Sequence, residues 1–289
     1  MIVEVVSIWY GVVCMLSWGF GDFLVKRIVG SIGYYRLLLY TQLVGLAPVF
    51  LLLTGFTLQL PSSLRTIGLI VGTGVCSFSA LFFFYKGLAI GKASIITPVA
   101  STWAVVAMAL SFAILGETLS LPQVLCIALV LTGIISLSMR SSSSGRSNLG
   151  ITYALGCTFF AGLNAVLLKL VSVDIGEIGT LFFNRVFLTL ILLVILPFFE
   201  NPSPRDVHRT VPVKAIVVVG LTEFLGYLAF IFGVGVGIVS IVTPISSASP
   251  VVTIVLAQVF LKETLTQTQK MAIVLVILGI VLLSILSSA

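Results

Sequence analysis

The sequence is poor in charge. Of its 289 residues only 8% are Asp, Glu, Lys or Arg, while 59% are hydrophobic. Soluble domains carry about 25% charged residues, because polar side chains must cover most of a surface that faces water. This chain has too few of them to do so. The composition therefore excludes a soluble globular protein and predicts one that is embedded in a lipid bilayer.

Side chains that carry out catalysis or bind metals are also scarce. The one histidine, His208, lies in a polar stretch, and the four cysteines lie singly in apolar runs without metal-ligand spacing. The sequence has no HExxH, paired-aspartate or phosphate-loop motif. The 15 Lys and Arg residues are scattered along the chain, without the basic stripe of a nucleic-acid-binding protein. We therefore predict no catalytic residue, no metal or cofactor, no nucleic-acid partner and no enzymatic activity.

Long apolar runs are abundant. A hydrocarbon core of about 30 Å needs roughly 20 apolar residues in a helix. We expect an all-α integral protein of the cell membrane with ten such helices, at about 6–28, 33–54, 66–89, 93–115, 121–139, 149–170, 178–199, 213–236, 239–261 and 268–287.

The chain consists of two related halves. A serine-rich linker at 140–148 separates a unit at 1–139 from a unit at 149–289. A shift of 146 residues aligns 84–138 with 230–284 without a gap, and 23 of those 55 positions are identical. The identical residues include Pro98 and Pro244, Glu117 and Glu263, and Gln123 and Gln269. Apolar composition alone does not place proline, glutamate and glutamine in register, so we infer a duplication.

Five helices per half is an odd number, so the second half enters the membrane in the opposite orientation. Inverted repeats of this kind are typical of secondary transporters, which bind their substrate near the middle of the bilayer and expose it alternately to each side. The organisation predicts such a transporter. A channel or a structural membrane protein is the alternative.

Several motifs resemble the drug/metabolite transporter superfamily, specifically its ten-span EamA-type members. They are Ser17-Trp18-Gly19 followed by Lys26, Pro98, Gly116-Glu117, Pro244 and Lys262-Glu263. The resemblance implies two inverted five-helix units around a central cavity. It also implies transport of amino acids, nucleosides, sugars or related metabolites, driven by ion gradients or exchange. Asp22 departs from the pattern, because an uncharged residue is expected there.

The expected partners are therefore a small organic substrate, amino-acid-like or related, the lipid bilayer, and protons as the coupling ion. No oligomer is required. The orientation stays open: the distribution of Lys and Arg places both termini outside the cell, whereas the resemblance implies that they are inside.

Ionisable residues inside apolar runs are costly, at least about 2.5–3.5 kcal/mol on insertion scales, and usually serve a function. Glu223 lies near the middle of the eighth predicted helix, where it could bind and release a proton; its counterpart in the first half is Ser77. A structural carboxyl hydrogen-bonded to a neighbouring helix is the alternative. Asp22 and Lys26 are four residues apart on one helix face and could pair, or Lys26 could extend to the headgroups.

Four further residues are candidates for substrate binding. Lys86 could meet an anionic group or extend to the headgroups, and Asn164 could bind substrate or join helices. We expect Pro98 and Pro244 to open the fourth and ninth helices, where free amides could hold a carboxylate. A plain helix start is the alternative. Arg185, like its counterpart Arg36, is expected to anchor to headgroups.

Overall fold

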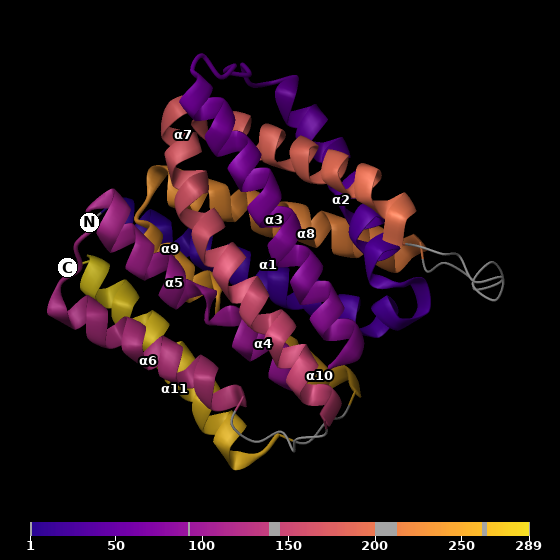
Figure 1. Ribbon diagram of the computed structural model, residues 1–289. Helices are drawn as coiled ribbons and strands as arrows, with labels where there is room; N and C mark the ends of the chain where they lie inside the picture. Colours follow the sequence, from indigo (N-terminus) through magenta and orange to yellow (C-terminus); the bar gives the residue numbers. More distant parts are fainter. Residues whose placement is uncertain (1, 92, 139–144, 200–212, 262–264, 289) are drawn as a thin grey trace.

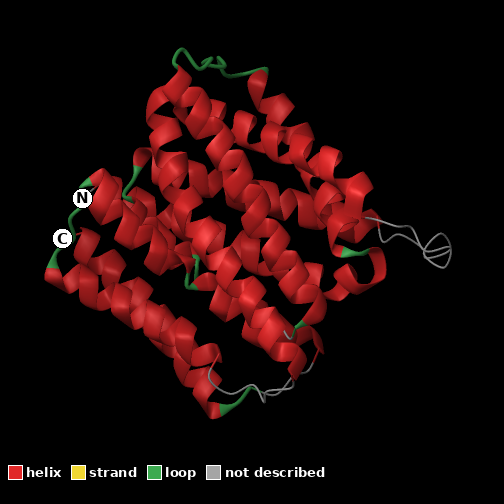
Figure 2. Ribbon diagram, viewed as in Figure 1, coloured by secondary structure: helices red, strands yellow, loops and turns green. Residues whose placement is uncertain are grey.

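The computed structural model describes residues 2–91, 93–138, 145–199, 213–261 and 265–288, and the regular structure in these ranges is helical throughout (Figure 2). The helices are α1 (Ile2–Ile32), α2 (Tyr34–Leu53), α3 (Leu64–Ile90), α4 (Ala93–Ser101), α5 (Trp103–Leu110), the π-helix η1 (Ser111–Leu115), α6 (Leu121–Ser138), α7 (Gly145–Phe199), α8 (Val213–Val236), α9 (Val239–Ser246), α10 (Ser249–Leu261) and α11 (Gln267–Ser288).

Several helical segments are long and apolar enough to cross a bilayer. Eight segments of the described chain meet that criterion, and Leu121–Ser136 is a shorter apolar helix. One of the eight, Leu149–Ile195, contains a break at Gly176. The expected all-α membrane fold is confirmed. The count of ten spans stays a prediction.

The break in α7 depends on a glycine. Gly176 has φ 72° and ψ 171°, a backbone conformation that residues with a side chain rarely adopt. The chain is helical on both sides of it and changes direction there (Figure 1). The second part of α7 therefore begins at Glu177. Arg185 lies more than two helical turns further along this part of the helix, which rises roughly 1.5 Å per residue.

The fourth and ninth predicted helices are each interrupted. The chain turns at Thr102 between α4 and α5, and at 247–248 between α9 and α10. The expectation that Pro98 and Pro244 open these helices is wrong, because each lies inside its helix. Proline removes one backbone hydrogen bond and crowds the preceding turn, which weakens a short helix.

Polar side chains satisfy the backbone at these interruptions. The hydroxyl of Thr102 donates to the carbonyl of Val99 at 2.7 Å, and Ser247 Oγ donates to the carbonyl of Pro244 at 2.9 Å. The start of α9 is capped by Glu117 from the other half of the chain. The carboxylate of Glu117 accepts the backbone N–H groups of Val239 and Ser240, both at 2.9 Å, and the Ser240 hydroxyl at 2.6 Å.

Equivalent close contacts join the two halves. A Cβ on Gly19 of α1 would lie 2.5 Å from Val252 Cβ of α10. A Cβ on Gly162 of α7 would lie 2.5 Å from Val106 Cβ of α5. The second contact is the repeat equivalent of the first, as a duplication would produce. Helices α6 and α11 pack against each other at one edge of the molecule (Figure 1).

Alanine at either of these glycines is expected to destabilise the protein. The added methyl group overpacks a helix contact, which typically costs about 1–3 kcal/mol. Thermal unfolding in detergent should show a lower Tm for Gly19→Ala and for Gly162→Ala. Gly30→Ala on α1 is the control, because nothing lies within 4 Å of a Cβ built there. An equal Tm for all three variants would contradict the packing argument.

Candidate functional site

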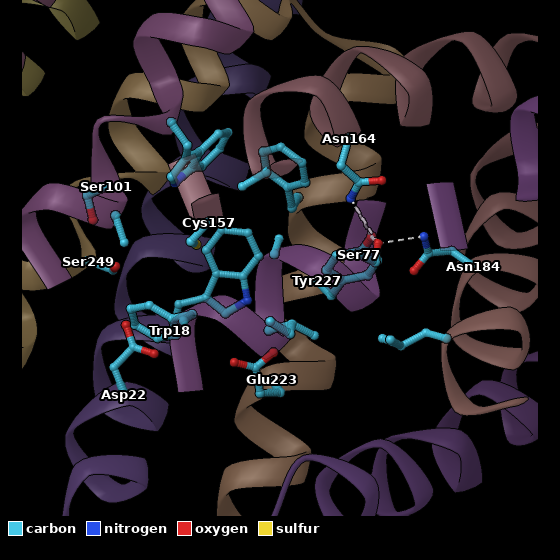
Figure 3. Close-up of a pocket in the computed structure, with 18 of the residues that line it drawn as sticks. Trp18, Asp22, Ser77, Ser101, Cys157, Asn164, Asn184, Glu223, Tyr227 and Ser249 are labelled. Atoms are coloured by element: carbon cyan, nitrogen blue, oxygen red, sulfur yellow. Dashed lines mark hydrogen bonds between the residues drawn. The ribbon is translucent and has the colours of Figure 1, made fainter. Parts of the chain in front are cut away.

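A cavity of about 130 Å³ lies between the two halves. Residues of α1, α3, α4 and α5 from the first half and of α7, α8 and α10 from the second line it (Figure 3). The interruptions of the two broken helices border it, since Ser101, Trp103 and Ser249 are among the lining residues.

Two carboxyl groups line the cavity. Asp22 comes from α1 and Glu223 from α8, and each residue is only 6% exposed. Within the described part of the chain, no hydrogen bond is donated to either carboxyl. In Figure 3 Asp22 lies toward Ser249, and Glu223 lies between Asp22 and Tyr227 in this view. Both groups can therefore receive a donor from a ligand.

One guanidinium group faces the same cavity. Arg185 of α7 is 2% exposed, and its Nη1 donates a hydrogen bond to Gln42 Oε1 of α2. Its Cζ lies 5.4 Å from the centre of the Tyr227 ring. Arg185 Nε and Nη2 have no hydrogen-bond partner among the described residues. A buried cation with two unused donors is costly unless a ligand fills them.

Amides and hydroxyls form a third group. Asn164 Nδ2 lies 3.0 Å from Ser77 Oγ and 3.2 Å from the Tyr227 hydroxyl, and Asn184 Nδ2 lies 2.8 Å from Ser77 Oγ. Figure 3 shows both asparagines converging on Ser77. The amide oxygens of Asn164 and Asn184 are buried and accept no hydrogen bond from the described chain. These oxygens are available to a ligand that carries N–H or O–H groups.

Aromatic rings form the apolar part of the wall. Trp18 and Trp103 pack edge to face with centroids 6.4 Å apart, and each lies 5.5 Å from Phe230. All three residues line the cavity. The ring faces offer apolar surface and attraction for a cation, so the cavity suits a small molecule with charged groups on an aliphatic frame.

Three of the residues predicted from the sequence lie together at this cavity: Asp22, Asn164 and Glu223. Lys26 does not line it and does not pair with Asp22 in the way its spacing suggested. Lys26 Nζ donates to the carbonyls of Leu88 at 3.0 Å and Gly91 at 2.8 Å, at the end of α3.

The repeat partner of Lys26 behaves in the same way. Lys169 Nζ donates to the carbonyls of Gly235 at 2.7 Å and Gly237 at 3.1 Å, at the end of α8. Each lysine satisfies carbonyls that have no partner within their own helix. This geometry favours a structural role for both side chains.

The other predicted residues also lie away from the cavity lining. Lys86 is half-buried, with Nζ 5.2 Å from the Phe82 ring centre and 4.7 Å from that of Tyr153. Pro98 and Pro244 are buried within α4 and α9. The structure brings the helix interruptions that follow these prolines to the cavity instead of the prolines themselves.

The sequence analysis missed Arg185. The expectation that it anchors to headgroups is wrong, because the side chain is 2% exposed and faces the cavity from well inside α7. Its depth in an apolar run was a usable signal, since a buried cation at that depth needs a partner. Asn184, Ser77 and Tyr227 gave no comparable signal, because single polar residues also join helices in membranes.

Discontinuous helices that meet a polar cavity between two repeats are the arrangement found in many secondary transporters. The model of the EamA-like transporter family matches the chain twice, over residues 5–139 and 148–285. The chain belongs to the EamA-like transporter family. It is therefore a multi-pass integral membrane protein of a transporter family, and the resemblance inferred from the sequence motifs is confirmed.

The chain is also similar to a curated relative and to a solved structure. An uncharacterized protein of Methanocaldococcus jannaschii is 39% identical over 98 residues, which cover 33% of this chain and 68% of the relative. A solved structure titled only as the crystal structure of a protein matches with a TM-score of 0.78 over 98% of this chain and 97% of the other. Its sequence identity is 17%, so this likeness concerns the fold alone.

Lys26 and Lys169 bind the carbonyls at the ends of α3 and α8, and replacing either is expected to lower the stability of the protein. Lys26→Met and Lys169→Met keep much of the aliphatic stem and remove hydrogen bonds from a charged donor, which are typically worth about 1.5–3 kcal/mol. Thermal unfolding in detergent should show a lower Tm for both, while Lys214→Met, at an exposed position near the start of α8, should leave it unchanged. An unchanged Tm together with lost substrate binding would make Lys26 a ligand contact.

Proposed function

We propose that this EamA-family protein is a secondary transporter for a small organic metabolite that carries an amine and a carboxylate, as amino acids do. One observation carries the proposal: a cavity between the two halves is lined by Asp22, Glu223 and Arg185, three buried residues with hydrogen-bonding capacity that the described chain does not use. Opposite charges held apart on rigid helices match a molecule with an anionic and a cationic group.

Alternating access fits the position of the cavity. Its walls come from both halves, so rocking one half against the other would expose the ligand to each side in turn. The close contacts of Gly19 and Gly162 lie between the halves, where such a movement would take place. A channel, the alternative, would instead need a continuous polar path through the molecule.

Proton coupling through Glu223 is the second part of the proposal. The charge of Glu223 acts on Cys14 and Asp22 of α1, Tyr85 of α3, Arg185 of α7 and Tyr227 of α8, and Arg185 in turn acts on Glu223. They include a second acid and one permanent cation. With both acids ionised the cavity has an excess negative charge, so a proton on one of them restores neutrality. A cationic substrate group can replace that proton.

Reconstitution tests the proposed function. Liposomes that contain the purified protein should show saturable uptake that is accelerated by the same compound inside, across a panel of amino acids, amines and organic acids. Counterflow of this kind requires a carrier. Ion currents far above carrier rates would instead support a channel. A folded protein that exchanges nothing in a broad metabolite panel would remove the transport proposal.

Glu223→Gln should abolish proton coupling without abolishing exchange. Glutamine keeps the shape of the side chain but cannot bind and release a proton. Uptake driven by an imposed pH gradient should fall to the level of protein-free liposomes, while one-for-one substrate exchange should continue. Asp174→Asn is the control, because Asp174 is exposed and does not line the cavity. Equal gradient-driven uptake by Glu223→Gln and wild type would leave Asp22 as the coupling group.

A further inference from the structure

The free edge of Arg185 is shaped for a carboxylate. Nε and Nη2 lie on one edge of the planar guanidinium, and both lack a partner among the described residues. Nη1 is already held by Gln42. Two parallel N–H groups in a fixed plane bind both oxygens of a carboxylate at once, and a guanidinium stays charged in proteins. Both atoms are buried, so a ligand carboxylate that reaches this edge would supply the hydrogen bonds that they lack.

Once Arg185 is paired with a ligand carboxylate, both acids of the cavity still need a cation. Asp22 and Glu223 come from different helices and receive no hydrogen bond from the described chain. The nearest lysine in sequence, Lys26, donates to the carbonyls at the end of α3 and is not among the residues that line the cavity. The lining residues thus supply two carboxyl groups and one cation.

We propose that the cavity is specific for a diamino monocarboxylate, a basic amino-acid-like compound of net charge +1. Its carboxylate binds the free edge of Arg185, and its two amines bind Asp22 and Glu223. The aliphatic chain between the amines packs against the aromatic wall of Trp18, Trp103 and Phe230. This inference rests on the proposed transport function and narrows its substrate class.

The proposed specificity for a diamino monocarboxylate follows from the number of charged groups in the cavity. A diamino monocarboxylate pairs every charge in the cavity, so neither acid is left buried and ionised without a cation. A neutral amino acid pairs Arg185 and one acid, and the other acid must then keep a proton. A simple diamine leaves Arg185 unpaired. The unpaired buried cation disfavours the diamine, and the neutral amino acid forms one ion pair fewer than the diamino compound, because specificity is the difference between binding free energies.

Counterflow with three related compounds tests the inference. Proteoliposomes loaded with L-lysine should exchange labelled L-lysine. L-norleucine lacks the side-chain amine and cadaverine lacks the carboxylate, and each should exchange at least about tenfold more slowly. Wild-type protein alone gives this result, so the test does not depend on a variant that folds. Norleucine exchange equal to or faster than lysine exchange would overturn the inference and leave the transport function intact.

Single removals of the acids provide a second readout. Asp22→Asn or Glu223→Gln leaves one carboxyl beside Arg185, a cavity that matches a neutral amino acid. The preference for lysine over norleucine should fall at least about tenfold in each variant. Asp174→Asn should keep the wild-type preference. An unchanged preference in both cavity variants, with wild-type melting curves, would also overturn the inference. Absence of exchange for the whole panel would remove the transport function as well.

Discussion

The fold depends on one constraint: in lipid, no water satisfies a backbone N–H or C=O group, so the protein must satisfy each of them itself. Lys26 and Lys169 bind the carbonyls at the ends of α3 and α8, and Glu117 binds the amides at the start of α9. Side chains from other helices thus satisfy the backbone where these helices begin or end. The breaks between α4 and α5 and between α9 and α10 create the irregular backbone beside which a polar cavity forms.

The duplication relates the contacts that hold the fold together, but it does not relate the charged residues of the cavity. The contacts of the fold occur in equivalent pairs: those of Lys26 and Lys169, and those of Gly19 and Gly162. The charged residues of the cavity do not. Glu223 has Ser77 as its repeat counterpart, and Arg185 has Arg36, which does not line the cavity. The matched contacts belong to the duplicated fold, while the unmatched side chains give the cavity its chemistry.

The sequence was sufficient for the class of fold, because hydropathy and a repeat in register are properties of whole segments. It placed Asp22, Asn164 and Glu223 among the site residues, since buried polar groups in a membrane helix are costly. It could not place Lys26 or Lys86, because a lysine stem spans several ångströms and its ammonium group can bind a helix end or lie over an aromatic ring. The role of Arg185 depended on which helix it faces, and α2 supplies that contact through Gln42.

The charge balance of the cavity connects substrate binding to the proposed movement of the two halves. A cavity that reorients within lipid carries its net charge through a medium where unpaired charge is expensive. In the proposed transport cycle, one of the two acids holds a proton while the cavity is empty and releases it when a substrate of net charge +1 binds. In this proposal the proton and the substrate cation exclude each other, so the same two carboxyls would select a cationic substrate and couple its movement to proton exchange. Selectivity and coupling are then two consequences of one arrangement, in which two acids and one arginine share a buried cavity.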